Sequence, residues 1–145
     1  MCRFATAVAL VLCSQGVASA DENEVALYDA SGEAVAYVDA DDEMTVYLWS
    51  GKPVAYLELD TGSSFHVYGF NGKHLGWFVD GILRDHDGDA ACALKQLISV
   101  PKFESFKGFK EFKPFKGFKE FAPFRPFFTN SWGGVPCAIL LATGS

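Results

Sequence analysis

The stretch that decides the fold is VYGFNGKHLGWF, residues 67–78, in which an Asn71-Gly72 pair separates two runs that alternate apolar with polar or small residues. A short glycine-containing turn between two such runs is the strongest local signal for a β-hairpin. The pattern returns as VYLWSGKPVAYL (46–57), as LYDASGEAVAYV (27–38) and, in a weaker form, as LRDHDGDAACAL (83–94). The sequence therefore predicts four copies of one hairpin.

A glycine marks each predicted turn, and the four glycines are separated by 19, 21 and 16 residues. If each loop has two residues, strand alternation divides every hairpin into two faces. One face carries a small residue at its centre in every copy, which predicts close packing around a common axis. These small residues are Ala36, Ala55, Gly76 and Cys92. We therefore expect an all-β fold of four repeated hairpins around a pseudo-four-fold axis.

The opposite face of the hairpins is mostly aromatic. It is expected to carry Tyr28, Tyr37, Tyr47, Trp49, Val54, Tyr56, Tyr68, Phe70, Leu75 and Trp77, and in the fourth copy Arg84, His86, Asp89, Ala91 and Ala93. An apolar face of this size is rarely bare on a soluble monomer. Either another part of the chain covers it, which we prefer, or it stacks on sugar rings or other ligands. The second interpretation makes Trp49, Tyr56, Tyr68, Phe70 and Trp77 the candidate ligand-binding residues.

A phenylalanine-rich segment follows Pro101, with Phe at every third position from Phe103 to Phe127. Within it FKGFKEFKP (106–114) recurs as FKGFKEFAP (115–123). A period of three matches an extended polyproline II strip with Phe on one edge and mostly Lys on a second, although short helical turns between Pro101 and Pro114 also remain compatible. The tail is thus expected to be extended and packed on the hairpin domain.

Two arrangements of this tail are open. In the first, which we prefer because apolar rows usually belong to a core, the Phe edge packs on the hairpins and the Lys edge faces their carboxylates or solvent. In the second, the Lys and Phe edges together bind an anionic envelope surface.

The first twenty residues have the pattern of a secretory signal peptide. A single early Arg3 precedes an apolar stretch, and Ala18-Ser19-Ala20 precedes an acidic start of the mature chain. A lipoprotein anchored at Cys13 is a weaker alternative, because Leu12 stands where a small residue is needed. We expect cleavage after Ala20 and a periplasmic or extracellular protein. The predicted organisation is a signal peptide (1–20), a hairpin domain (21–97), a Phe/Lys-rich segment (98–132) and a C-terminal tail (133–145).

Charge is divided unequally along the chain, whose net charge is −6. Residues 21–97 carry fifteen acidic and four basic side chains, whereas the residues from 98 onward carry seven basic and three acidic ones. This division predicts that the tail binds its own domain or an anionic partner. The acidic hairpin domain argues against nucleic acid, and no stretch is long and apolar enough for a transmembrane segment.

Removal of the leader would leave two cysteines, Cys92 and Cys137. Two interpretations are open: a disulfide that ties the fourth hairpin to the C-terminal tail, or a Cys92 that is only a small core residue. The DHDGD string (85–89) has acidic residues beside a glycine, but it lacks the spacing of a calcium loop and is interpreted as the fourth turn. We expect no metal and no cofactor.

The three histidines, His66, His74 and His86, have no nucleophile at a recognisable spacing. No phosphate-binding loop or nucleophile elbow is found either. We therefore expect no enzyme and no catalytic residues.

Several strings resemble the four-fold beta-flower domain proteins, a family of small bacterial proteins. These are GKPVAYL (51–57), YGFNGKHLGWF (68–78), DHDG (85–88) and FRPFFTNSW (124–132). The resemblance implies hairpins around a pseudo-four-fold axis, and it implies no activity or catalytic residues. Taken together, the sequence predicts an exported, non-catalytic repeat protein of the bacterial cell envelope or periplasm with a structural or interaction role and no known partner. The alternative is a module that binds an envelope glycan or an anionic surface.

Overall fold

The protein forms a closed barrel of eight antiparallel strands in a computed structural model that describes residues 23–145. The predicted signal peptide lies outside these residues. Each strand pairs with its neighbours in the chain, and β1 closes the barrel by pairing with β8. The strands are β1 (Glu24–Tyr28), β2 (Ala34–Asp39), β3 (Thr45–Leu48), β4 (Pro53–Leu59), β5 (Phe65–Gly69), β6 (His74–Val79), β7 (Ile82–Arg84) and β8 (Ala90–Leu94). The all-β class and the four successive hairpins were therefore predicted correctly.

Each hairpin turn has three residues between its closing pair rather than two. In the first, the Asp29 amide donates to the Glu33 carbonyl at 2.8 Å, and the Gly32 amide donates to the Asp29 carbonyl at 3.0 Å. Gly32 has a φ of 88°, and the turn glycines of the other hairpins have φ between 86° and 99°. This is a tight turn followed by a left-handed residue, a position that glycine occupies without strain.

A bulge after each turn places one extra residue in the second strand of every hairpin. In the third hairpin, Val67 faces Gly76 and Tyr68 faces His74, so Leu75 has no partner. Val54 and Ala91 occupy the same position in the second and fourth hairpins. All three lie in the buried core, so their predicted placement on the aromatic face was wrong. The prediction failed because strict alternation does not hold across a bulge.

The interior of the barrel contains the apolar face that the sequence predicts. Ala36, Ala55 and Cys92 are fully buried there, and Gly76 has no room for a side chain because a Cβ would lie 1.8 Å from the Arg84 carbonyl oxygen. The short helix α1 (Cys137–Ala142) closes one end of the interior with Leu141 in the core.

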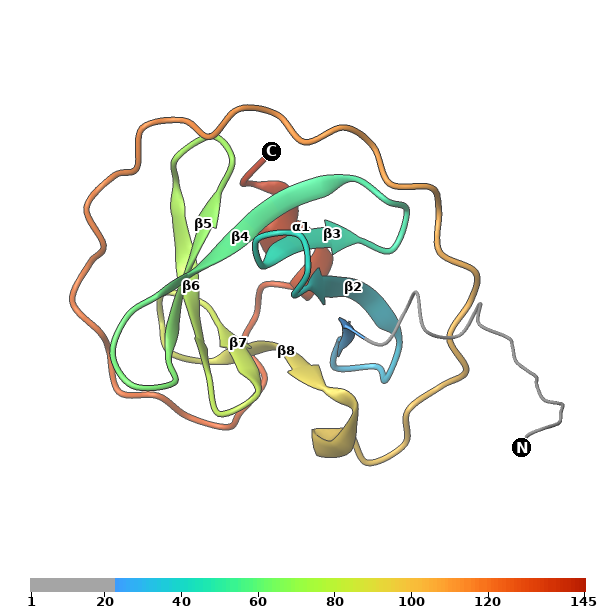
Figure 1. Cartoon of the computed structure of the whole chain (residues 1–145). Coiled ribbons are helices and arrows are strands. Elements are labelled where there is room, and N and C mark those ends of the chain that lie inside the picture. Colours follow the sequence, from blue (N-terminus) through green and yellow to red (C-terminus); the bar gives the residue numbers. More distant parts are fainter. Residues whose placement is uncertain (1–22) are drawn as a thin grey trace, which may run out of the picture.

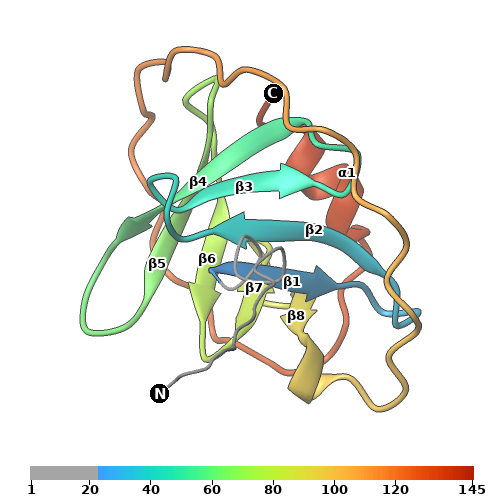
Figure 2. The same cartoon turned by 45° about the vertical axis from the view of Figure 1, so that its right-hand side comes forward.

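Helix α1 is attached by a disulfide between Cys92 and Cys137, whose Cα atoms are 5.3 Å apart. It packs against β2, β3, β4 and β8 (Figure 2). A cross-link between residues 45 positions apart constrains the unfolded chain and is worth about 4 kcal/mol by loop-closure entropy.

The Phe/Lys-rich segment surrounds the barrel. After the 3-10 helix η3 (Lys95–Leu97), residues 100–129, which we name the belt, form neither helix nor strand. Figure 1 shows the belt in orange running round the outside of the hairpins before the chain returns to α1. Within residues 23–145, no helix has the length and apolar character to cross a membrane.

Candidate functional site: the belt around the barrel

The belt is bound to the barrel at each of the four turns by a hydrogen bond from its backbone. In each case a belt amide donates to the carbonyl of the turn glycine. These bonds run from Lys102 to Gly32 (2.9 Å), from Glu111 to Gly51 (3.0 Å), from Glu120 to Gly72 (2.9 Å) and from Thr129 to Gly88 (3.0 Å). The donors are nine residues apart, so the nine-residue sequence repeat corresponds to one hairpin of the barrel.

Glycines permit the close approach of the two backbones at these points. Gly108 donates to the Trp49 carbonyl at 2.9 Å, and a Cβ at Gly108 would lie 1.9 Å from the Ser50 carbonyl oxygen. Gly117 repeats the contact at the third turn, where its amide donates to the Phe70 carbonyl at 2.6 Å. At the fourth turn Pro126 takes this place and has no amide hydrogen to donate.

The lysine edge of the belt faces the aromatic face of the barrel. This face is made by Tyr28, Tyr37, Tyr47, Trp49, Tyr56, Tyr68, Phe70 and Trp77. Lysine ammonium groups lie over its rings. The Nζ atom of Lys107 is 4.6 Å from the centre of the Tyr37 ring, and that of Lys116 is 4.2 Å from the centre of the Tyr56 ring. Such cation–π contacts strengthen when the cation is partly removed from water.

The same lysines form ion pairs with carboxylates of the barrel. Lys107 and Lys110 lie 2.7 and 2.9 Å from the two oxygens of Glu24, and Lys110 also pairs with Asp39. Further pairs join Lys113 to Asp42 (2.7 Å) and Glu43 (3.1 Å), Lys119 to Glu58, and Arg125 to Asp60 (2.6 Å). The basic tail thus binds its own acidic domain, which is one of the two outcomes that the charge division allows.

These ion pairs change the titration of the groups they join. Burial alone would raise the pKa of Glu24, but the hydrogen bonds and charges of Lys107 and Lys110 outweigh it and lower the pKa. For Lys110, desolvation is likewise outweighed by Asp39 and Glu24, and its pKa is raised. Both shifts favour the charged pair at neutral pH.

The phenylalanine edge faces solvent, which contradicts the preferred interpretation of the tail. The nine side chains, which we name the phenylalanine row, are between 96 and 104 % exposed. They are Phe103, Phe106, Phe109, Phe112, Phe115, Phe118, Phe121, Phe124 and Phe127. The prediction failed because the surface under the belt consists of aromatic rings beside carboxylates. A lysine satisfies both kinds of group, whereas a phenylalanine there would leave buried carboxylates without counter-charges.

The five predicted ligand-binding residues lie under or beside the belt. Tyr56, Tyr68, Phe70 and Trp77 are at most 5 % exposed, and only Trp49 keeps partial exposure. The indole Nε1 of Trp49 donates to the Ser105 carbonyl at 3.0 Å. Another part of the chain therefore covers this face, and a sugar ring would reach four of the five residues only if the belt moved. Ligand binding by these residues stays a prediction.

A chain of three histidines, not expected from the sequence, lies on the outer face of the barrel at the third and fourth hairpins, where His74 is buried. His74 Nε2 is 3.0 Å from His66 Nδ1, and His74 Nδ1 is 3.0 Å from His86 Nε2. The chain ends at Asp60, whose carboxylate is 3.4 Å from His66 Nε2. Burial and the two neighbouring imidazoles lower the pKa of His74 to about 4, which keeps this ring neutral at pH 7.

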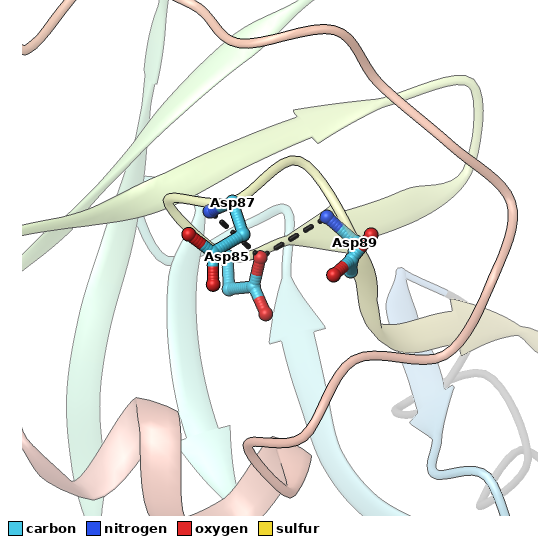
Figure 3. A group of neighbouring side chains, drawn as sticks. All are labelled: Asp85, Asp87 and Asp89. Atoms are coloured by element: carbon cyan, nitrogen blue, oxygen red, sulfur yellow. Dashed lines mark hydrogen bonds between the residues drawn. The ribbon is translucent and has the colours of Figure 1, made fainter.

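The side chain of Asp85 stabilises the backbone of the acidic turn in the fourth hairpin. One oxygen of Asp85 accepts hydrogen bonds from the amides of Asp87 and Asp89, each at 3.0 Å (Figure 3). Asp29 holds the first turn in the same way through Ser31 and Glu33. Asp85, Asp87 and Asp89 can offer three oxygens within 4.8 Å of one another. The matching role of Asp29 shows that the geometry of this turn needs no metal ion.

These features define a small barrel of four hairpins enclosed by a belt from its own C-terminal half. The chain matches the family model described as 4-fold beta flower protein over residues 25–141 and belongs to that family. No curated protein and no solved structure is significantly similar to the chain.

Proposed function

We propose that this chain is an exported, non-catalytic interaction module of the bacterial cell envelope or periplasm, with the phenylalanine row as its contact surface. The observation that carries the proposal is the complete exposure of nine aromatic side chains on a backbone that is itself held in place. Exposed apolar area of this extent on a soluble protein usually marks an interaction site.

The row is suited to binding because the belt is already ordered. Four backbone hydrogen bonds and the lysine ion pairs hold it on the barrel before any partner arrives. A partner therefore gains the burial of phenylalanine surface, worth roughly 1.5–3 kcal/mol for a fully buried ring, without a large ordering cost for the belt backbone.

Two features support export. The leader of residues 1–20 has the composition of a signal peptide. The disulfide between Cys92 and Cys137 is the kind of bond that persists in oxidising compartments such as the periplasm.

The alternative of a glycan- or anionic-surface-binding module receives less support. Lys107, Lys110 and Lys113 are engaged with barrel carboxylates, so the belt does not direct these charges toward an anionic surface. A glycan-binding role through the aromatic face would require the belt to detach first.

Photo-cross-linking in cells tests the proposal. The full chain is expressed with p-benzoylphenylalanine at Phe112 and, as a control, at Leu59, an exposed apolar residue on β4 outside the belt. We expect adducts from position 112 and none from position 59, on a protein whose mass shows the loss of residues 1–20. An exported protein that gives no adduct from Phe112 or any other position of the row would contradict the interaction role. A chain that keeps its leader would contradict export.

A further inference from the structure

The identity of the partner can be narrowed from the shape and charge of the phenylalanine row. We propose that the row binds the interfacial zone of a phospholipid bilayer through apolar contacts, without a need for lipid charge. This inference rests on the proposed function, because it names the partner of the same surface.

The shape of the row favours lipid over a rigid partner. The belt circles the barrel, and it passes directly over the turns of successive hairpins (Figure 1). The carbonyls of Phe109, Phe118 and Phe127 lie against Gly51, Gly72 and Gly88 respectively. The row therefore faces several directions around the molecule. A rigid, flat partner can touch only the phenylalanines on one side of the belt and must match the shape of each ring, whereas lipid acyl chains rearrange around every ring that enters the interfacial zone.

The area available to a flat partner strengthens this argument. Two or three phenylalanines at roughly 150–250 Å² each provide less than the roughly 800 Å² per partner of a standard protein interface. A second copy of the chain, placed against one side of the belt, would leave most of the row in water.

The apolar surface also continues from the belt onto the end of the barrel that α1 closes. Trp132, Val135 and Ile139, which are between 40 and 60 % exposed, lie there. Leu97, Val100 and Trp132 line one shallow pocket with the first turn, Ala30–Ser31–Gly32. A bilayer that meets this end contacts the row and the end face together, and tryptophan and phenylalanine are suited to that boundary.

Charge decides between apolar and electrostatic attachment. Attraction to anionic lipid needs basic side chains that face outward. Here Lys107, Lys110, Lys113, Lys119 and Arg125 pair with carboxylates of the barrel. The exposed turn residues Glu33, Lys52, Lys73 and Asp87 are of mixed sign and can remain at the level of the headgroups. Zwitterionic lipid should therefore be sufficient.

Vesicle flotation tests the inference with the oxidised mature chain, residues 21–145. The vesicles are pure phosphatidylcholine, with a second set containing phosphatidylglycerol, each at 0.15 M and 0.5 M NaCl. We compare the wild-type chain with F109S/F118S/F127S and with the matched control F109L/F118L/F127L, which keeps apolar side chains at the same exposed positions. Thermal melts confirm that both variants retain the wild-type fold.

We expect the wild-type chain to float with phosphatidylcholine at both salt concentrations. The serine variant should lose at least tenfold in partition, and the leucine control should stay within about threefold of wild type. Absence of flotation with phosphatidylcholine, or flotation that needs phosphatidylglycerol and disappears in 0.5 M NaCl, overturns the inference. Equal partition of the serine variant and the wild type overturns it as well. A stable dimer of the chain that does not bind vesicles would also overturn it.

The result is separable from the proposed function. If vesicles do not bind but Phe112 still cross-links to protein in cells, the lipid inference fails and the interaction role stands. If Phe112 gives no adduct either, both fail.

Discussion

The barrel and the belt are both built from short repeats, but the barrel buries its apolar residues whereas the belt exposes them. In each hairpin the small and aliphatic residues turn inward, away from water. In the belt the charged edge turns inward and the phenylalanines face solvent. The difference shows that a period tells which side chains share an edge, whereas the composition of the opposing surface decides which edge is buried.

The largest effect is expected inside the barrel, at the link to α1. Replacing both cysteines in C92A/C137A should lower the free energy of unfolding by about 4 kcal/mol, because the cross-link spans 45 residues. Urea unfolding of the oxidised wild type and the variant measures it. Equal midpoints would show that the disulfide does not contribute to the stability of the barrel.

The second effect concerns pH, at the histidine chain between barrel and belt. His74 has a folded-state pKa of about 4, below its usual value of 6.5, so the fold favours the neutral ring. The resulting contribution to the free energy of unfolding is fully present above pH 6.5 and is lost as the pH falls from 6.5 to 4. The total loss is on the order of 3 kcal/mol. His66 and His86 add to the lowering, and Glu120 and Asp60 oppose it.

Urea unfolding at pH 7.5 and 4.5 measures this loss. The variant H74Q keeps hydrogen-bonding groups without a titrating ring and should show a much flatter pH dependence across this range. An identical loss in wild type and H74Q would assign the pH dependence to other groups.

A third, smaller effect is expected where the belt backbone touches a turn. In G108A the added Cβ would lie 1.9 Å from the Ser50 carbonyl oxygen, which should cost about 2 kcal/mol and detach the belt locally. Hydrogen exchange at the amides of residues 108 and 111 reports the detachment. The control G134A meets open space and should leave exchange unchanged. Equal protection in both variants would argue against close backbone packing.

The smallest effect is expected from a single belt lysine. K110M keeps the apolar stem and removes the charge that faces Glu24 and Asp39. Because the Lys110 side chain is 38 % exposed, water screens the pair, and we expect a loss of about 1 kcal/mol. K95M, at an exposed lysine of η3, is the control and should lose less than half as much. A larger loss in K95M would contradict the assigned role of the lysine edge.

Much of the barrel could be predicted from the sequence because its signals are local. The turn glycines and the small residues at Ala36, Ala55, Gly76 and Cys92 identify four hairpins around a common interior. The bulges could not be predicted in the same way, because one extra residue at Val54 or Leu75 leaves no local mark.

The candidate site was harder to predict because its contacts join distant segments. The nine-residue repeat was visible, but its match to one hairpin appears only when the bonds from Glu111 and Glu120 to successive turns are known. The histidine chain likewise can be predicted only when the third hairpin is known to lie beside the fourth, because His74 and His86 belong to different hairpins. A signal existed for the belt's orientation: aromatic and acidic residues under it favour lysine as the inward side chain.

The orientation of the belt is the central claim, and ¹⁹F NMR of the mature chain labelled with fluorophenylalanine tests it most directly. A soluble paramagnetic agent should broaden the ¹⁹F resonances of the nine residues in the row. The resonances of the buried or half-buried Phe65, Phe70, Phe78 and Phe128 should be protected from this broadening. Nine accessible and four protected resonances are the predicted result. Protection of most of the row would mean that the phenylalanines pack on the barrel, and it would contradict both the arrangement and the functions proposed from it.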